Sequence, residues 1–433
     1  MQFMNSKVFD LIKKEAHRQK NGLEMIPSEN YTSENVMRAM GSILTNKYSE
    51  GHPGARYYGG NEIIDEIEKY AQSLANKLFG TEYAIVQPHS GSPANLAVAL
   101  ELAGPGGTTL GLNLTSGGHL THGSKASWTG KIFNAINYDV DPETWRIDLD
   151  EVETLAKKHK PKFIWVGTTA YPYKLDYKGF SQIAEKVGCF LVADTSHISG
   201  LIVTGLHPDP TPFVDVITTT THKTLRGPRG AMILITKKGL AKDPELEKRL
   251  KKSVMPGLQG GPHDHQTAAI AVSLEEALKP SFKKYMEQVV KNAKVLANEL
   301  GVDTETHLVL KSLTDYGFGM GSQAQYALEE AGITVNMNTI PGEPVSPFYP
   351  SGIRLGSPAL TTRGMNEGDM IKIAGWIKEI LEEVRGKDLP KEQSARAPFL
   401  KEVKNNLREN KTLKRIREEI ESFAGKFPVP GIN

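Results

Sequence analysis

The sequence predicts an α/β fold built around a mostly parallel sheet. Short runs rich in β-branched and aromatic residues alternate with segments of helical periodicity, which is typical of β-α-β units. The chain of 433 residues is long enough for two or three folding units with a cleft between domains. Glycine and proline gather between the periodic segments, and we see no internal repeat.

The first strongly periodic segment predicts a core-packing helix. One helical face carries Ile63, Ile67, Tyr70, Leu74 and Leu78, and Gly80 follows as a C-cap. A series of strands with interleaved helices comes next. The strands are expected at 83–86, 108–112, 163–166, 189–193, 214–219 and 231–235, and the helices at 93–102 and 179–187.

A second unit is predicted toward the C-terminus. A long helical pattern begins near His265, and it is followed by strands at 307–310 and 333–336 and a helix at 369–384. From Lys387 the tail carries charges of both signs, which favours a solvated helix covering this unit over a nucleic-acid arm. The expected domains are an N-terminal arm (1–30), a large cofactor-binding domain (31–270) and a small C-terminal domain (271–433).

Composition excludes several classes of function. Lys and Arg total 52 against 50 for Asp and Glu, so no overall field favours nucleic acid or an anionic membrane. The single cysteine, Cys189, excludes intramolecular disulfides and multi-cysteine metal sites, and it fits a reducing compartment. The N-terminal segment lacks the apolar stretch of a signal peptide, and no later stretch is apolar enough to span a bilayer. We therefore expect a cytoplasmic protein without membrane or nucleic-acid partners.

Ligands of an open parallel sheet bind beyond the carboxyl ends of its strands. After the first predicted strand, Ser90, Gly91 and Ser92 precede a helix that is expected to begin at Pro93. Backbone amides, hydroxyls and the positive end of a helix together suit a phosphate. The alternative is an ordinary helix start.

Two further strand ends carry reactive side chains. Asp194 and His197 follow one run, where an isolated aspartate commonly only caps a loop. Another run leads to His222 and Lys223. A lysine is usually a solvated charge, but at the end of a buried strand it can be desolvated until its neutral amine is available for Schiff-base chemistry.

Together these strand ends predict a pyridoxal phosphate site, with an anion cradle, an acid for the ring nitrogen and a lysine for the aldehyde. A buried carboxylate such as Asp194 would keep the ring nitrogen protonated. The segment GGHLTHG adds His119 and His122, and an imidazole stacked on the ring would hold its plane. Zinc is the alternative for this histidine pair, but the flanking glycines indicate a loop rather than a metal-binding helix, so no metal is expected.

The sequence resembles the serine hydroxymethyltransferases from about Leu23 to Gly375. The shared motifs are SENYTS from Ser28, LTNKYSEGHPGARYYGG from Leu44, QPHSGSPAN from Gln87, GGHLTHG from Gly117, TTTTHKTLRGPRG from Thr218, QGGP from Gln259, SPF from Ser346 and SGIRLG ending at Gly356. The resemblance implies an aspartate-aminotransferase-like fold of fold type I with active sites shared across an obligate homodimer, a tetramer being the alternative. It also implies reversible conversion of L-serine and tetrahydrofolate to glycine and 5,10-methylenetetrahydrofolate.

The resemblance also implies roles for residues at the cofactor. Lys223 would link covalently to pyridoxal phosphate, Asp194 would hold the ring nitrogen, and His119 would stack on the ring. The ring oxygen would contact His197 and Thr169, and His222 would lie beside the lysine. The phosphate would be bound by Ser90, Gly91 and Ser92, assisted from the other subunit by Tyr48 and Gly261.

On the substrate side, the resemblance implies that Arg354 clamps the carboxylate bidentately, with Ser28 at the same end. Glu50 would be the acid/base near the substrate hydroxyl and the folate, flanked by Tyr57 and Tyr58. The pterin pocket would be lined by Leu114, Gly118, Leu120, Asn338, Ser346, Pro347 and Phe348. Packing remains the alternative for Tyr57, Leu114 and Leu120, and Arg56 and Arg229 could simply brace backbone carbonyls.

The chain departs from the family's usual pattern at Thr195, Ser196, Thr169 and Met337. The first three leave the amino-acid chemistry intact. Met337 replaces a lysine common in bacterial members, which bears on the preferred folate or polyglutamate form.

Other functions share much of this site. A folate-independent aldolase for β-hydroxy amino acids and an α-methylserine hydroxymethyltransferase would keep every cofactor contact, so only the pterin-side Glu50, Leu120 and Asn338 favour the folate enzyme. A general aminotransferase would need a second carboxylate clamp. A non-catalytic regulatory protein on the same fold is expected to have lost Lys223, Asp194 or Arg354, and all three are present.

Overall fold

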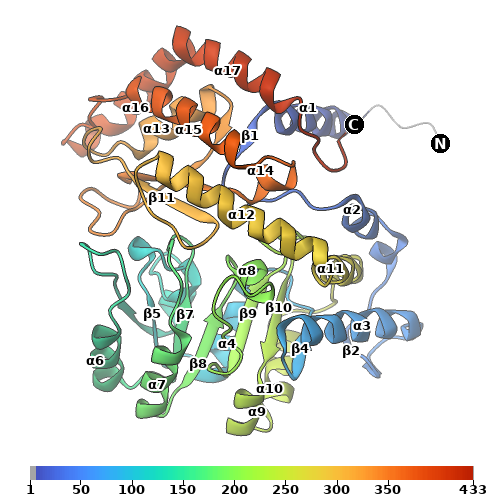
Figure 1. Cartoon of the computed structure of the whole chain (residues 1–433). Coiled ribbons are helices and arrows are strands. Elements are labelled where there is room, and N and C mark those ends of the chain that lie inside the picture. Colours follow the sequence, from blue (N-terminus) through green and yellow to red (C-terminus); the bar gives the residue numbers. More distant parts are fainter. Residues whose placement is uncertain (1–5, 433) are drawn as a thin grey trace. The chain divides into compact units, whose positions relative to one another are not determined.

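The computed structural model describes residues 6–432, which form two compact units (Figure 1). The larger unit is Thr32–Glu287, and the smaller one combines residues 6–31 with 288–432. The predicted domain boundaries lie after residues 30 and 270, so the expected N-terminal arm groups with the C-terminal part of the chain. The assignment of functions to these domains stays a prediction.

The larger unit is organised around one mixed sheet. Within the described residues this sheet has seven strands in the order β4-β10-β9-β8-β7-β5-β6. The strands are β4 (Tyr83–Ile85), β5 (Thr108–Leu112), β6 (Asn134–Tyr138), β7 (Phe163–Gly167), β8 (Phe190–Asp194), β9 (Val216–Thr220) and β10 (Ala231–Ile235). Only β10 runs antiparallel to its neighbours β4 and β9 in this sheet, which confirms the prediction of a mostly parallel sheet.

All six strands predicted for this unit are present; two match the predicted ends, and the ends of the other four are shifted by one or two residues at most. In β7, β9 and β10 every residue is buried, as expected for strands covered on both faces. The strand β6 was not predicted, because its two asparagines are residue types depleted in strands. It lies at the edge of the sheet and pairs with β5 alone among the described strands.

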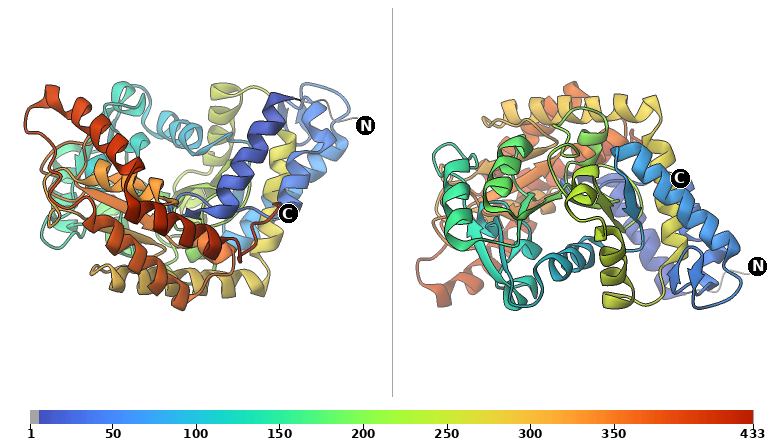
Figure 2. Two further views of the ribbon diagram at one scale, coloured as in Figure 1. Left: turned by 90° about the horizontal axis from the view of Figure 1, so that it is seen from above. Right: turned by 90° about the horizontal axis from the view of Figure 1, so that it is seen from below.

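Helices cover both faces of this sheet. In the views of Figure 2, α4 lies on one face and α7 on the other; α4 packs against β9 and β10, and α7 against β7 and β8. The helices of the unit are α2 (Glu34–Met40), α3 (Glu62–Phe79), α4 (Gly91–Ala103), α5 (Thr129–Ile132), α6 (Leu149–His159), α7 (Tyr177–Val187), α8 (Ser199–Val203), α9 (Lys237–Lys242), α10 (Leu246–Lys252) and α11 (Asp264–Ala277). Short helical turns lie at η1 (Ile43–Asn46), η2 (Leu114–Ser116), η3 (Leu120–His122) and η4 (Ser253–Leu258).

Two helix ends test the sequence predictions directly. Gly80 ends α3 with φ of 69°, the left-handed conformation that favours glycine, which confirms the predicted C-cap. The predicted start of α4 at Pro93 is wrong. Ser90 is extended and serves as the N-cap, so the helix already begins at Gly91.

The smaller unit contains a three-stranded antiparallel sheet in the described residues, in the order β11-β14-β13. Its strands are β11 (Leu308–Ser312), β13 (Asn336–Asn338) and β14 (Gly352–Gly356), and β1 (Leu23–Glu24) pairs separately with β12 (Ile333–Thr334). The predicted strand at 333–336 is therefore two short strands. The strand β14 was missed, because a glycine stands at each end and an arginine interrupts its apolar residues.

The charged tail folds as two helices that cover this unit's core. Leu413, Ile416 and Ile420 of α17 are fully buried in that core, while the charged residues remain outside. The helices are α1 (Lys7–Asn21), α12 (Pro280–Glu299), which also contains the division between the units, α13 (Gly321–Glu330), α14 (Pro358–Thr362), α15 (Glu367–Glu382), α16 (Gln393–Arg408) and α17 (Lys411–Ala424).

None of the helices in residues 6–432 is both long and apolar enough to cross a bilayer.

Candidate active site

The carboxyl end of β8 holds a buried acid. Asp194 is the last residue of that strand, and Asn95 and His122 donate to its Oδ2 at 2.8 Å and 3.1 Å. The backbone N–H of Ser196 donates to Oδ1 at 3.1 Å. Burial acts to raise the pKa of Asp194, but the hydrogen bond from His122 and that from Ser196 outweigh it and hold that pKa well below its usual range. The side chain is therefore an anion throughout the neutral range, as an acid facing a protonated ring nitrogen must be.

The hydrogen bonds of His122 indicate that Asp194 is the acid of a hydrogen-bonded pair and not a metal ligand. The ligating atoms of His119, His122 and Asp194 lie within 4.8 Å of one another. However, His122 Nδ1 accepts from the backbone N–H of His119 at 3.3 Å, so we assign the ring hydrogen to Nε2, which donates to Asp194. A metal would need the lone pair that this hydrogen occupies. The ring of His122 is also stacked on Trp165, with centroids 5.0 Å apart.

Lys223 follows the buried strand β9, three residues beyond its end, and is 8% exposed. Backbone hydrogen bonds close its loop, from Thr221 to Gly230 at 3.1 Å and from Gly227 to Thr221 at 2.7 Å. In the parallel register of β8 and β9, Asp194 lies opposite Thr218. The lysine and the acid thus emerge at the same edge of the sheet from adjacent strands.

The start of α4 offers backbone amides beside the end of β9. Ser90 is the N-cap, and its side chain makes no capping hydrogen bond within the described helix. A Cβ on Gly91 would lie 2.7 Å from Thr220 Cγ2, so only glycine fits this approach. The free N–H groups and the positive end of a thirteen-residue helix suit a phosphate at this position.

The loop formed by the GGHLTHG motif is hydrogen-bonded to Thr169, which follows β7. Thr169 donates from its backbone N–H to Gly117 O at 2.7 Å and from Oγ1 to Gly118 O at 2.8 Å. A Cβ on Gly118 would meet Leu112 O at 2.0 Å, so the loop requires glycine there. His119 Nδ1 lies 2.7 Å from Thr121 Oγ1. The hydroxyl of Thr169 therefore orients the loop that carries His119.

The residues that depart from the family pattern also brace this edge. The backbone N–H of Thr220 donates to Ser196 Oγ at 3.1 Å, and Thr195 Oγ1 lies 3.3 Å from Ser199 Oγ. His197 is buried, and its carbonyl accepts from Thr224 Oγ1 at 3.0 Å, next to Lys223.

His222 has a buried Nδ1 that finds no hydrogen-bond partner among the described residues. Burial, and then the charge of Lys223, lower the pKa of His222 to about 3. The imidazole is therefore neutral at physiological pH, and it leaves one polar atom for a bound group to satisfy.

The segment of Glu50 forms a separate cluster in the same unit. Tyr48 Oη donates to Glu50 Oε1 at 3.1 Å, and the Tyr48 and Tyr58 rings meet edge to face with centroids 5.1 Å apart. A Cβ on Gly261 would lie 3.2 Å from the Tyr48 ring, so Gly261 borders the same cluster. Tyr48, Tyr57 and Tyr58 are 53%, 72% and 49% exposed, which argues against a packing role within one chain.

Arg56 fixes this segment to the rest of the unit. Its guanidinium forms ion pairs with Asp65 at 2.8 Å and with Glu68 at 2.7 Å, and it donates to the carbonyls of Ser49 and Gly51 at 2.8 Å and 3.0 Å. These carbonyls flank Glu50, so the expectation that Arg56 braces backbone is confirmed.

The remaining predicted residues divide between the two units. Leu114 and Leu120 lie in η2 and η3 of the larger unit, where Leu120 is 45% exposed. In the smaller unit, Ser28 follows β1, Asn338 ends β13, and Arg354 lies in β14; the segment Ser346, Pro347 and Phe348 precedes β14, with Phe348 82% exposed. Arg354 Nε donates to Asn336 Oδ1 at 3.0 Å, and burial lowers the pKa of Arg354 to about 10.

The sequence did not point to Asn95, Gln87 and Glu68, whose side chains hold Asp194 and Arg56 in place. Asn95 donates both to Asp194 and to Thr121 Oγ1, each at 2.8 Å, and thereby joins α4 to both neighbouring segments. Its only signal in the sequence is a polar residue within an apolar helix, a position usually occupied by core side chains.

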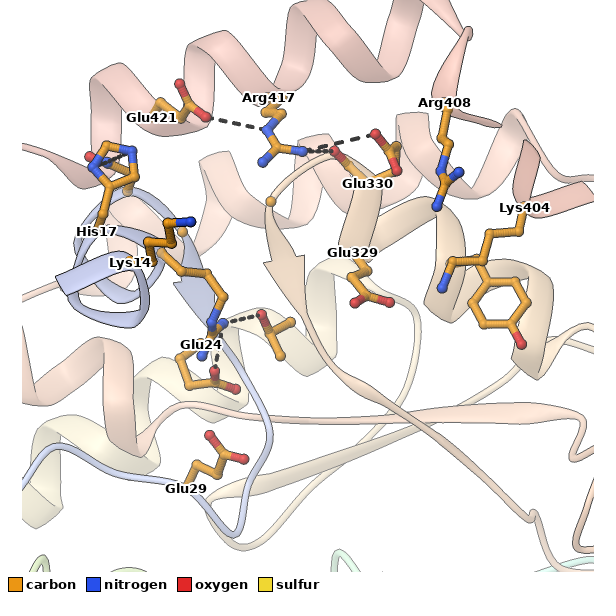
Figure 3. Close-up of a pocket in the computed structure, with 16 residues that line it drawn as sticks. Lys14, His17, Glu24, Glu29, Glu329, Glu330, Lys404, Arg408, Arg417 and Glu421 are labelled. Atoms are coloured by element: carbon orange, nitrogen blue, oxygen red, sulfur yellow. Dashed lines mark hydrogen bonds and ion pairs between the residues drawn. The ribbon is translucent and has the colours of Figure 1, made fainter. Parts of the chain in front are cut away.

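A cavity of about 560 Å³ in the smaller unit has no predicted site residue in its lining. Figure 3 shows charges of both signs on its walls, with Arg417 bound to Glu421 at 3.2 Å and to the Glu330 carbonyl at 3.2 Å. Burial, and then the charge of Glu29, raise the pKa of Glu24, one of the lining residues, to about 8. The balance of charges selects no class of ligand, so we assign none.

The residues at the sheet edge fit pyridoxal phosphate, because an ionised buried acid, an unsatisfied imidazole nitrogen and a glycine-lined helix start lie around a buried lysine. Comparison with known proteins agrees. A family model described as serine hydroxymethyltransferase matches residues 1–377. The chain belongs to the serine hydroxymethyltransferase family.

Curated relatives cover nearly the whole chain. The chain is 52% identical over 383 residues to serine hydroxymethyltransferase 1 of Pseudomonas aeruginosa, an alignment that covers 87% of this chain and 90% of the relative. It is 47% identical over 434 residues to a serine hydroxymethyltransferase of Acidothermus cellulolyticus, with 98% and 96% covered. Fold type I, predicted from the resemblance, is confirmed, and nothing in these comparisons favours the aldolase, α-methylserine or regulatory alternatives.

Proposed function

We propose that the sheet edge around Lys223 and Asp194 is the active site for the pyridoxal phosphate-dependent serine hydroxymethyltransferase activity that family membership gives this chain. The observation that carries this assignment is the ionised, buried Asp194 on the strand next to the one that leads to buried Lys223. The reaction is the reversible conversion of L-serine and tetrahydrofolate to glycine and 5,10-methylenetetrahydrofolate.

Bound pyridoxal phosphate would supply an electron sink for the bond that breaks at the substrate Cα. Asp194 would hold the proton at its ring nitrogen, and Lys223 Nζ would provide the amine for the covalent link. The start of α4, with Ser90, Gly91 and Ser92, would bind the phosphate. His119 would stack on the ring, Thr169 and His197 would contact its ring oxygen, and His222 would lie beside the lysine.

Arg354 would bind the carboxylate of serine or glycine, helped by Ser28. A fixed carboxylate sets which bond of Cα stands perpendicular to the ring and can break, so this contact controls the type of reaction. Glu50 would hold or move a proton at the serine hydroxyl and the folate nitrogens, with Tyr57 and Tyr58 beside it. The pterin would contact Leu114, Gly118, Leu120, Asn338 and the segment Ser346 to Phe348.

We further propose a cytoplasmic homodimer in which the Tyr48, Glu50, Tyr58 and Gly261 cluster serves the partner's active site. The support is the exposure of three neighbouring tyrosines on one segment, since large exposed apolar surfaces mark interaction sites. The single cysteine supports a reducing compartment.

The test is to add glycine to the holoenzyme with and without tetrahydrofolate and to record its visible spectrum. A new long-wavelength band that grows only when the pterin is present supports the folate-dependent activity. The same band at full strength without the pterin would instead support the aldolase, and no change in either case would overturn the assignment.

A further inference from the structure

Two segments assigned to the cofactor phosphate are joined by a pair of stacked imidazoles. His89 directly precedes Ser90 at the start of α4, and His263 follows Gly261 by two residues and is the N-cap of α11. The ring centroids are 3.9 Å apart and the planes are 2° from parallel. Aromatic pairs usually have centroids at least about 4.5 Å apart, so this contact is close.

A glutamine forms a second link between the same segments. The backbone N–H of His89 donates to Gln259 Oε1 at 3.0 Å, and Gln259 Nε2 donates to the Gln87 carbonyl at 2.9 Å. Gln259 therefore holds the backbone on both sides of Pro88. Because Gln259 directly precedes Gly260 and Gly261, both phosphate-side segments are fixed to each other at two points.

The stack requires neutral rings, and its surroundings keep them neutral. Burial, and then the charge of His263, lower the pKa of His89, while a hydrogen bond to the Gly261 backbone opposes this shift. Burial, and then the charge of His265, lower the pKa of His263, while Asp264 opposes this shift. Two uncharged imidazoles can lie face to face without electrostatic repulsion.

The geometry argues against a metal role for these histidines. The ring of His265 continues the stack, with its centroid 5.8 Å from that of His263 and its plane tilted by 20°. Lone pairs of an imidazole lie in the ring plane, so nearly parallel stacked rings do not direct them toward one point.

We propose that His89 and His263 are positioning residues for the phosphate of pyridoxal phosphate. The stack fixes the Ser90 to Ser92 segment, which binds the phosphate in the subunit's own site, to the Gly261 segment, so the Ser90 to Ser92 side of that site keeps its shape before the cofactor arrives. This inference rests on the proposed phosphate site. In the proposed dimer, the stack also connects each subunit's own phosphate site to the segment that serves its partner.

The experiment compares His263→Ala and His263→Phe with the wild-type enzyme. The imidazole of His263 makes no capping hydrogen bond in α11, so alanine removes the stack without removing a cap. After removal of the cofactor, the affinities for pyridoxal phosphate and for pyridoxal without its phosphate are measured by absorption titration. His159→Ala, in the last turn of α6, is the matched control.

The expected result for His263→Ala is a loss of about three- to tenfold in affinity for pyridoxal phosphate, with unchanged affinity for pyridoxal. His263→Phe restores a flat ring and is expected to restore the affinity, and the control should match wild type. Equal weakening for both ligands, no weakening at all, or failure of phenylalanine to rescue would overturn the positioning role. If wild type binds pyridoxal as tightly as pyridoxal phosphate, the phosphate site itself is wrong and the inference falls with it.

Discussion

The Glu50 side chain is positioned by neighbouring residues of its own segment, so a single substitution can test its role. Tyr48 donates to Oε1, and Arg56 binds the carbonyls on both sides of the residue. A carboxyl group held in this way is ready to exchange a proton with a bound hydroxyl or amine.

The substitution Glu50→Gln is therefore expected to keep cofactor binding and to lose folate-dependent turnover by roughly 10²-fold or more, because the amide cannot exchange a proton. The measurement is kcat for serine with tetrahydrofolate, together with the absorption of the bound cofactor. Exposed Glu66→Gln in α3 is the control and should behave as wild type. Near-normal turnover in Glu50→Gln would refute the acid/base role.

Glu24 makes stability depend on pH in a direction that is opposite to that of most carboxylates. Burial, and then the charge of Glu29, raise its pKa to about 8 from the ordinary 4.5 of a glutamate. The folded protein therefore binds a proton that the unfolded chain releases, and stability falls as the pH rises between these two values.

Glu24→Gln should thus flatten the decline of the urea midpoint between pH 5 and pH 8 and raise the midpoint at the alkaline end. The measurement is urea unfolding at several pH values, with exposed Glu418→Gln in α17 as the control. A decline as steep as that of the wild type would contradict the protonated state of Glu24.

At the scale of elements, the short hairpin of β2 (Gly51–His52) and β3 (Ala55–Arg56) depends on a buried ion network. The Arg56 and Glu68 side chains are 4% and 3% exposed, and Gln87 Nε2 connects Glu68 to the Gly51 carbonyl. Removing the cation alone would leave a buried carboxylate without its partner, which is costly.

Arg56→Met is expected to lower the free energy of unfolding by about 3–5 kcal/mol. Adding Glu68→Gln should recover part of this loss, because the unpaired charge is then gone. The exposed pairs of Arg415 provide the comparison, since Arg415→Met is expected to cost no more than about 1 kcal/mol. Additive losses in the double variant would argue against the coupling.

Element types were predictable from the sequence wherever periodicity was strong. The helical periodicity of α3 and α7 and the buried runs of β7 and β10 leave little choice of structure. The predicted core face of α3 is wrong, because Ile63 is 64% exposed and Tyr70 49% exposed, and of the predicted residues only Leu74 is buried. Predictions failed where polar or glycine residues occupy regular elements, as in β6 and β14, because tertiary pairing overrides local preference there.

The candidate site was predictable for a different reason. Strand ends mark the sheet edge where Asp194 and Lys223 emerge, and motif resemblance supplied the remaining roles. Asn95 and the His89–His263 stack were not predictable, because each acts through contacts between segments distant in the sequence. Such contacts have no periodic signature.

At the scale of the whole molecule, the proposed dimer places Lys223 and Glu50 of one active site on different subunits. Lys223→Ala and Glu50→Gln proteins should each be nearly inactive, whereas a co-refolded mixture should regain about one quarter of wild-type activity. This follows because half of the dimers in a random mixture carry one intact site out of two. The control is a mixture of either variant with wild type at the same total subunit concentration. If the mixture of the two variants recovered no activity, each active site would lie within one chain.

The most direct test of the central claim is to reduce the holoenzyme with borohydride and to locate the modified lysine by peptide mass spectrometry. The account predicts a phosphopyridoxyl group on Lys223, and its loss in Lys223→Ala but not when the exposed Lys69 is replaced. A stable adduct on another lysine, or none in protein saturated with pyridoxal phosphate, would contradict it.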